Sequence, residues 1–316
     1  MTSLLVSVLS ELEPVVAREL DRHLAAAREW MPHEYVPWSL ARDFDGPMGG
    51  QAWDVSQSSM SAVVRTALVV NLLTEDNLPS YHREIHRCMG ADGAWATWIG
   101  RWTAEEGRHG TAIRDYLLVT RAVDPTALER ERMIHMTGGY GRDNDPDVFD
   151  TLAYVTFQEL ATRIAHRNTG KQSGDPVCER LLTRIATDEN LHMVFYRNML
   201  DAALELSPDR TMEAIWGAIE GFKMPGSTIE GFGRRSLQIA MAGIYDLRIH
   251  RDEVLMPVVR QLGLLERTTG LGDTGRAAQA ALGSFLEVLD AKAARFESKR
   301  AAALESEARR QASALS

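Results

Sequence analysis

The sequence predicts an all-helical protein built around a four-helix bundle, with additional helices before and after it. Two observations support this fold class. First, a Glu-x-x-His motif occurs twice, as Glu106 with His109 and as Glu189 with His192, and residues three apart lie on one face of a helix. Second, a single glutamate precedes each motif at nearly the same distance: Glu75 lies 31 residues before Glu106, and Glu159 lies 30 residues before Glu189.

Turn-forming residues stand in the middle of each of these two intervals. They are Gly90-Ala91-Asp92-Gly93 in the first interval and Ser173-Gly174-Asp175-Pro176 in the second. Two antiparallel helices joined at each turn would bring the single glutamate level with the motif that follows. One glutamate from each of two helices and Glu-x-x-His from each of the other two is the ligand set of dinuclear carboxylate bundles. The alternative is two exposed Glu-His pairs on ordinary helix surfaces, and the symmetric spacing of all six residues favours the metal site.

Composition limits the classes of function. The 316 residues are 45% hydrophobic and 25% charged, as in an ordinary globular protein, and we expect a single domain over 1–316. The net charge of −9 argues against a general role in nucleic-acid binding. No run of about 18 apolar residues predicts a membrane span, and the acidic N-terminal segment favours a helix over a signal peptide. Two widely separated cysteines, Cys88 and Cys178, fit a reducing cytoplasm.

Apolar periodicity and turn signals place the elements in order. Leu5, Val8, Leu12, Val16 and Leu20 recur at helical spacing in an N-terminal helix over about 2–29. Prolines make the stretch from Trp30 to Gly50 a loop. The bundle should occupy about 55–206, and accessory helices should follow to about residue 310. The expected helices after the loop are 55–87, 93–121, a short piece within 122–145, 147–169, 176–206, 208–222, 229–248, 251–263 and 273–310.

Other side chains on these helices have plainer interpretations. Trp95, Trp98 and Trp102 form a stripe typical of a helix core. His82 and His86 could be additional ligands, but they suit an outer polar position better. His166 lies seven residues after Glu159 on the same face, which places it two turns away. We therefore expect it to lie too far from the metal pair to act as a ligand.

The predicted ligands indicate the metal. Four carboxylates carry four negative charges, which two ferrous ions balance, so an apolar bundle interior can hold the reduced site. Oxygen and imidazole ligands without thiolate favour iron, with manganese as a substitute, over structural zinc. Open coordination positions would remain for dioxygen.

Several stretches, in order, resemble the soluble acyl-[acyl-carrier-protein] desaturases. They are WMPHEYVP, LLTEDNLPSY, WTAEEGRHG, TFQELAT, ATDENLH, KMPG and TTGLGDTGRAAQ, between about Trp30 and Gln279. The actinobacterial members are the most similar, because no plastid transit peptide precedes the first helix. The resemblance implies an all-helical, ferritin-like homodimer. It also implies a di-iron centre that uses dioxygen and two electrons from ferredoxin and its reductase to introduce a cis double bond into a carrier-bound acyl chain.

The resemblance also implies roles for individual residues. Glu75, Glu106, His109, Glu159, Glu189 and His192 would be the iron ligands, with Glu106 and Glu159 as the carboxylates shared by the two ions. Thr162 would lie beside the oxygen-binding face, although a threonine hydroxyl in a helix often binds its own backbone. Asp188 would face a ligand histidine. Trp30 matches a surface tryptophan that begins an electron path through His109, or it is a packing anchor.

Acyl carrier proteins are acidic, so docking on this acidic chain requires a local basic patch. The candidate carrier-binding residues are Arg18, Arg22, Arg28, Arg65, Arg83 and Arg87.

Other classes of function remain open on the sequence. They are a di-iron hydroxylase, a ribonucleotide reductase small subunit, an iron store, a scaffold, and a member of the family that has lost its activity. A reductase subunit typically has Asp as its first ligand where this chain has Glu75, and an iron store needs no helices after Leu206.

Overall fold

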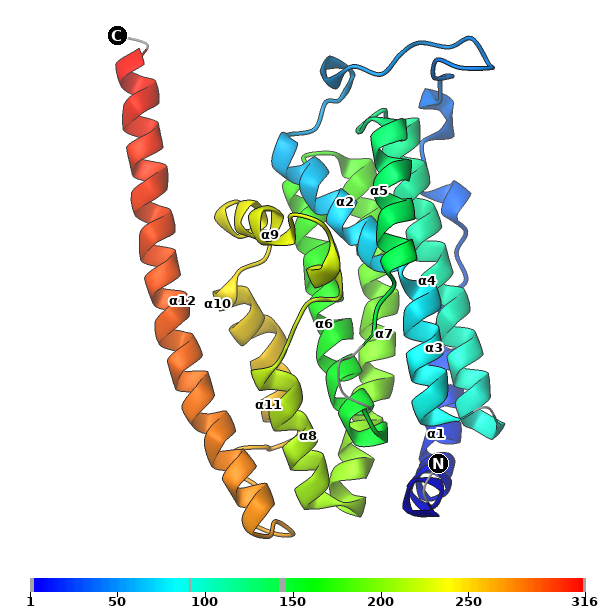
Figure 1. Ribbon diagram of the computed structural model, residues 1–316, viewed down its shortest axis with the longest axis vertical. Coiled ribbons are helices and arrows are strands. Elements are labelled where there is room, and N and C mark those ends of the chain that lie inside the picture. The colour runs from blue at the N-terminus through cyan, green and yellow to red at the C-terminus, as the bar shows by residue number, and fades with distance from the viewer. Residues whose placement is uncertain (1–2, 91, 142–145, 315–316) are drawn as a thin grey trace.

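The computed structural model describes residues 3–90, 92–141 and 146–314. Apart from one isolated bridge between Phe44 and Gln51, the regular structure of these residues is helical, which confirms the predicted fold class. Four helices form the central bundle (Figure 1). They are α2 (Ala62–Asp76), which α3 (Leu78–Met89) continues, α4 (Gly93–Val119), α6 (Val148–Gln172) and α7 (Pro176–Leu206).

The second hairpin of the bundle, α6 with α7, follows its sequence signals closely. Gly174 adopts a positive φ of 68° in the turn. Asp175 then caps α7, because its Oδ1 accepts a hydrogen bond from the Val177 amide at 2.8 Å, and Pro176 occupies the first turn. The two helices approach closely at Gly170, where a Cβ atom would lie 3.2 Å from the Cα of Glu179. The predicted bounds of α7 are confirmed.

The first hairpin differs from the prediction of one helix over 55–87. A short 3₁₀ turn occupies Val55–Gln57, Ser61 caps α2, and the helix is interrupted at Asn77, two residues after Glu75. Pro79 explains the interruption, because proline lacks the backbone donor and disfavours helical geometry in the residue before it. In the predicted turn before α4, Gly90 and Gly93 adopt positive φ angles, whereas Ala91 lies outside the described residues.

Helix α1 (Ser3–Ala26) packs against α4 and α7 through buried side chains that include Leu12 and Val16. Two 3₁₀ turns, Pro32–Glu34 and Trp38–Leu40, lie in the predicted loop. Helix α5 (Pro125–Gly138) contacts α2. Between α5 and α6, the structure describes residues 139–141 and 146–147.

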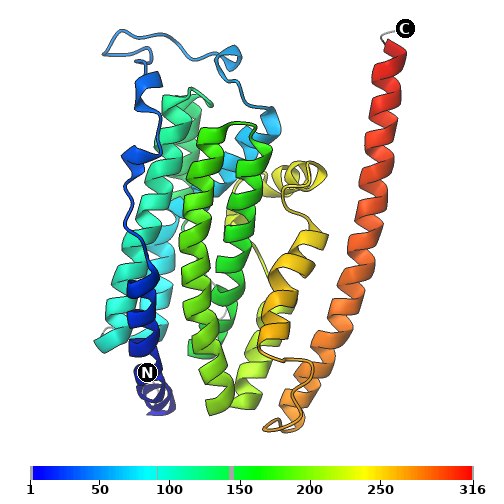
Figure 2. The ribbon, with the colours of Figure 1, turned by 180° about the vertical axis from the view of Figure 1, so that it is seen from behind.

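The C-terminal part is more broken than predicted. The expected helices over 229–248 and 251–263 are divided where Gly243 adopts a positive φ and where a π-helical stretch covers His250–Leu255. Helix α12 begins against α8, and its distal half stands away from the bundle in both views (Figures 1 and 2). The C-terminal helices are α8 (Pro208–Glu220), α9 (Phe232–Met241), α10 (Leu247–Ile249), α11 (Met256–Gln261) and α12 (Asp273–Ala314). Within the described ranges, no helix combines the length and apolar character that crossing a membrane requires.

Candidate metal centre

The six predicted ligands converge in the interior of the bundle. Glu75 comes from α2, Glu159 from α6, and one Glu-x-x-His motif each from α4 and α7, and all six side chains are buried. Their ligand atoms form two groups, each within 4.8 Å. The first group contains Glu75, Glu106, His109 and Glu189, and the second contains Glu106, Glu159, Glu189 and His192.

Glu106 and Glu189 belong to both groups, which makes them the carboxylates that could bridge two ions. The Nδ1 atom of His109 lies 3.2 Å from Glu189 Oε1 and 3.4 Å from Glu106 Oε2. The Nδ1 atom of His192 lies 2.8 Å from Glu106 Oε1 and 3.5 Å from Glu159 Oε2. The prediction that Glu159 is shared is therefore wrong in this geometry, because Glu159 belongs only to the group of His192.

Five of the inward-facing atoms make no hydrogen bond with any described residue, although they are buried. They are Glu106 Oε1, His109 Nδ1, Glu159 Oε2, Glu189 Oε1 and His192 Nδ1. Buried carboxylate and imidazole atoms without hydrogen-bond partners are costly unless they bind a cation. Five of the six predicted ligands thus present such an atom to the same space, and this donor set fits a pair of divalent ions.

The pKa shifts within the cluster also fit a site for cations. Burial and the charge of Glu106 raise the pKa of Glu159 well above its usual range. Burial lowers the pKa values of His109 and His192, but neighbouring carboxylates outweigh it and raise both pKa values well above their usual range. The carboxylates therefore attract positive charge, whether protons or metal ions.

Asp188 faces a ligand histidine, as predicted, since its Oδ2 lies 3.5 Å from His109 Nε2. Burial raises the pKa of Asp188, but hydrogen bonds from His109 and Trp30 outweigh it and lower this pKa to about 2. The indole of Trp30 donates to Asp188 Oδ2 at 2.7 Å and stacks near His109, with ring centroids 6.4 Å apart. Trp30 is only 3% exposed, so the expectation of a surface tryptophan is wrong. The side chains of Arg108, Arg184 and Tyr35 lie against its ring.

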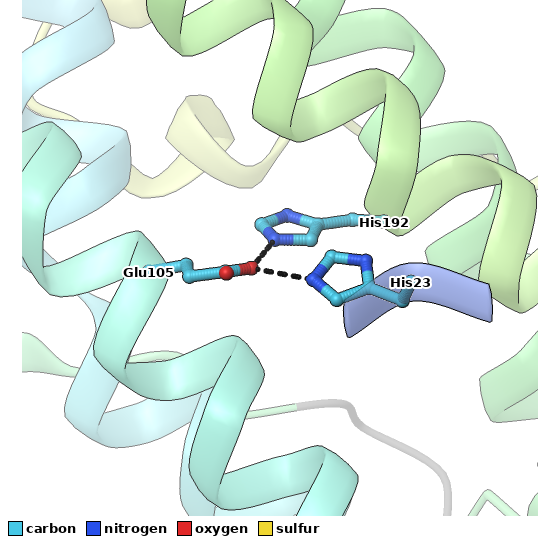
Figure 3. Close-up of side chains that lie close together, drawn as sticks. All are labelled: His23, Glu105 and His192. Atoms are coloured by element: carbon cyan, nitrogen blue, oxygen red, sulfur yellow. Dashed lines mark hydrogen bonds and ion pairs between the residues drawn. The ribbon is translucent and has the colours of Figure 1, made fainter. Parts of the chain in front are cut away.

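The His192 side of the site has an equivalent carboxylate, Glu105, that is not among the predicted site residues. Glu105 Oε2 lies 2.9 Å from His192 Nε2 and 3.0 Å from the Nε2 of His23, a residue of α1 (Figure 3). Both carboxylates directly precede a ligand glutamate, and each contacts an arginine four residues earlier: Arg101 for Glu105, and Arg184 for Asp188. The pattern Arg-x-x-x-acid-Glu-x-x-His, present twice, was the sequence signal that would have found it.

Helix α6 provides two further contacts with the ligands. Thr162 Oγ1 lies 3.0 Å from Glu189 Oε2, and it also lies close to two backbone carbonyls of its own helix. His166 was excluded as a ligand and belongs to neither metal group, but its Nε2 lies 2.9 Å from Glu75 Oε1. Counting turns along α6 could not reveal this contact, because Glu75 reaches His166 from α2.

The tryptophan stripe is buried as predicted, and its last member also contacts a ligand. The indole nitrogen of Trp102 donates to Glu159 Oε1 at 3.0 Å. His86 is exposed and His82 is half-buried against Thr103, which confirms their outer positions.

Two cavities with mainly apolar walls adjoin α6 near the ligand cluster. One touches Thr162 and His166, and its other walls include Val70, Phe232, Ile239 and Tyr245. The other touches Gln158 and Trp102, and its other walls include Tyr81, Ile85 and Tyr154. Apolar walls beside a polar centre suit an aliphatic ligand.

The six arginines proposed for carrier binding lie on or just after three helices. Arg18 and Arg22 both contact Glu19 on α1, and Arg83 and Arg87 both contact Glu84 on α3. Arg28 is exposed just after α1. Arg65, on α2, lines a surface pocket that also includes Arg234 and Arg235.

Several known proteins are similar to this chain in sequence or in fold. The model of the fatty acid desaturase family matches residues 5–314. A Mycobacterium tuberculosis protein named "Putative acyl-[acyl-carrier-protein] desaturase DesA1" is 46% identical over 311 residues, which cover 96% of this chain and 91% of that protein. The rice protein acyl-[acyl-carrier-protein] desaturase 7, chloroplastic, is 29% identical over 318 residues, covering 93% and 76%.

A solved structure agrees with the sequence comparisons. The X-ray structure of DesA2 from Mycobacterium tuberculosis superposes with a TM-score of 0.70 at 31% identity, covering 86% of this chain and 99% of that one. Together with the match of the family model along nearly the whole sequence, this confirms the resemblance stated above. The chain belongs to the fatty acid desaturase family.

Proposed function

We propose that this protein is an oxygen-dependent acyl-[acyl-carrier-protein] desaturase that introduces a cis double bond into a carrier-bound fatty acyl chain. The observation that supports this proposal most is the pair of overlapping ligand groups in the core, which share Glu106 and Glu189. The names of the relatives supply the substrate class.

Two iron ions per chain would occupy the two groups, with manganese as a substitute. Glu75, Glu106, His109 and Glu189 would hold one ion, and Glu106, Glu159, Glu189 and His192 would hold the other. The metal pair, when bound, supplies an oxidant from dioxygen and two electrons, because no side chain can remove hydrogen from an unactivated methylene pair.

The protein's own residues would bind the substrate, orient it and exclude water. The apolar walls beside Thr162 and Gln158 would hold the acyl chain near the metal pair and keep it dry. Thr162 would act on oxygen handling through its contact with Glu189, and Asp188 would fix the ring of His109.

Electrons would come from ferredoxin and its reductase. Trp30, Asp188 and His109 form a continuous set of contacts toward the ligand cluster, and we propose that this set is the electron path. Because Trp30 is buried, the donor would dock over it and not touch its ring. We further propose that the enzyme acts in the cytoplasm as a homodimer, as the family resemblance implies.

The acyl carrier protein would dock through arginines, because it is acidic while this chain has a net charge of −9. The candidates are Arg18, Arg22, Arg28, Arg65, Arg83 and Arg87. Charge reversal at Arg22 and Arg83 should weaken carrier binding, and more strongly at low salt, where screening is weakest. Unchanged affinity at low ionic strength would place the docking surface elsewhere.

The reaction is tested with acyl-carrier substrate, ferredoxin, its reductase, NADPH and oxygen, with the products identified by mass spectrometry. The expected product has lost two hydrogen atoms, and the Glu189→Ala variant serves as the inactive control. The same acyl chain offered as free acid or as coenzyme A thioester should react poorly. Gain of one oxygen atom would identify a hydroxylase instead. No reaction in fully metal-loaded protein would indicate a storage or scaffold protein.

A further inference from the structure

A buried triad joins the N-terminal helix to the metal centre. His23 on α1, Glu105 on α4 and His192 on α7 are all buried, and both imidazole Nε2 atoms approach the same carboxylate oxygen, Glu105 Oε2 (Figure 3). The second oxygen of Glu105 accepts a hydrogen bond from Arg101 Nε at 2.6 Å. Nitrogen atoms from three helices, α1, α4 and α7, therefore contact the two oxygens of this carboxylate.

This arrangement determines which atom of His192 faces the metals. A carboxylate bound by an arginine accepts hydrogen bonds and donates none, so both Nε2 atoms must carry the proton. In the metal-bound form, the Nδ1 atom of His192 would then present its lone pair to the ion held with Glu106 and Glu159, as a metal ligand requires. The Nδ1 atom of His23 is buried and has no hydrogen-bond partner in the described part of the chain, so the contact with Glu105 is its only anchor of this kind.

Aromatic packing holds His23 in this position. Its ring meets Trp98 edge-on with centroids 5.0 Å apart, and it stacks on His192 at 5.7 Å. Trp98 is in turn stacked on Phe195. A side chain enclosed in this way has few alternative rotamers. The hydrogen bond from His23 to Glu105 therefore exists before metal binds, and metal binding costs no further conformational entropy of His23.

The other half of the site is built in the same way. Asp188 takes the place of Glu105, His109 that of His192, Arg184 that of Arg101, and the outer donor is Trp30. Trp30 and His23 are seven residues apart in the chain, so both outer donors come from the N-terminal segment. This segment therefore reaches the carboxylate behind each ligand histidine.

We propose that His23 is a positioning residue of the metal centre: its hydrogen bond fixes Glu105 against His192, so that α1 helps to orient the second ligand imidazole. This inference rests on the proposed metal centre but not on the reaction proposed for it. A third metal ion among His23, Glu105 and His192 is a competing explanation. The guanidinium of Arg101 on Glu105 disfavours it, because a cation already neutralises that carboxylate.

The test uses two substitutions of the same residue. His23→Gln keeps an N–H donor, whereas His23→Leu removes it. In protein loaded with cobalt(II), each ligand imidazole should give one solvent-exchangeable N–H resonance shifted by the metal, and Trp30→Phe identifies the one from His109. His23→Leu should displace the His192 resonance and release one of the two ions about tenfold faster, and His23→Gln should restore much of both. His82→Leu, a half-buried histidine on α3, is the matched control.

A double-mutant cycle with Glu105→Gln separates positioning from general packing. If His23 acts through Glu105, the double variant should release metal no faster than Glu105→Gln alone. Additive effects, equal loss of both ions, or an unchanged His192 resonance in His23→Leu would overturn the proposal. A third ion per wild-type chain that His23→Leu abolishes would replace it with a metal site. Wild-type protein that binds two ions but does not desaturate would refute the proposed reaction alone, and protein that binds none would refute both.

Discussion

Replacing Glu189 by alanine should remove the metal-dependent stability of this protein, whereas replacing Glu159 should remove about half of it. The reason is geometric: Glu189 belongs to both ligand groups, and Glu159 belongs only to the group of His192. Loss of Glu189 therefore takes a ligand from both ions, and loss of Glu159 takes a ligand from one.

The size of the effect follows from linkage. An ion at about 1,000 times its dissociation constant stabilises the folded protein by about 4.1 kcal/mol. At about 2.1 cal/mol/K per residue, the unfolding entropy of the 316 residues is about 0.66 kcal/mol/K. Each ion should therefore raise the melting temperature by about 6 °C. Wild type should gain about 12 °C on metal loading, Glu159→Ala about 6 °C, and Glu189→Ala little.

The assay is calorimetry of each variant with and without iron(II) under anaerobic conditions, together with metal analysis after gel filtration. Each loaded protein is compared with its own metal-free form, because removal of a buried carboxylate also relieves repulsion in that form. If Glu159→Ala lost both ions and Glu189→Ala kept one, Glu159 would be the shared ligand after all. Full gains in both variants would refute the site.

Three further outcomes are expected. Thr162→Val should keep both ions but lower the yield of product per oxygen consumed, measured with an oxygen electrode and mass spectrometry. Loss of iron from this variant would show instead that the contact of Thr162 with Glu189 supports metal binding. Burial lowers the pKa of His250 from 6.5 to about 4, so the unfolded chain takes up a proton first and stability should fall as the pH drops through this range. Urea titrations at several pH values should show that the free energy of unfolding falls by at most about 3 kcal/mol, and by less in His250→Gln. The same pH dependence in the wild type and in this variant would contradict the prediction. Gly170→Ala should cost about 1–3 kcal/mol because the new Cβ would press on α7, whereas Gly107→Ala, with only Leu78 at 3.9 Å, should stabilise by up to about 1 kcal/mol. Equal urea midpoints for these two variants would refute the close approach.

The sequence alone determined the all-helical class, the bounds of the fourth ligand-bearing helix, α7, and the six residues that converge inside the bundle. These features depend on local rules: helical periodicity, turn residues at the middle of each interval, and the three-residue spacing of Glu106 and His109. A repeat of 83 residues between the two motifs made their symmetry visible without any tertiary information.

Local rules failed where a contact crosses between helices. The first ligand helix was predicted as continuous, although Pro79 was present in the sequence as the signal for its interruption. The contacts of His166 with Glu75 and of His23 with Glu105 had no such signal, because they join residues 91 and 82 positions apart.

Only the tertiary structure decided which carboxylates are shared. Along the sequence, Glu159 is a single glutamate and Glu189 belongs to a Glu-x-x-His motif, but neither position shows which of the two lies within reach of both ions. The rotation and crossing of α4, α6 and α7 bring Glu189 to both groups and leave Glu159 in one. These angles are set by many contacts at once, including the stacking of Trp98 on Phe195 and the close approach of α6 to α7 at Gly170, and no spacing along one helix encodes them.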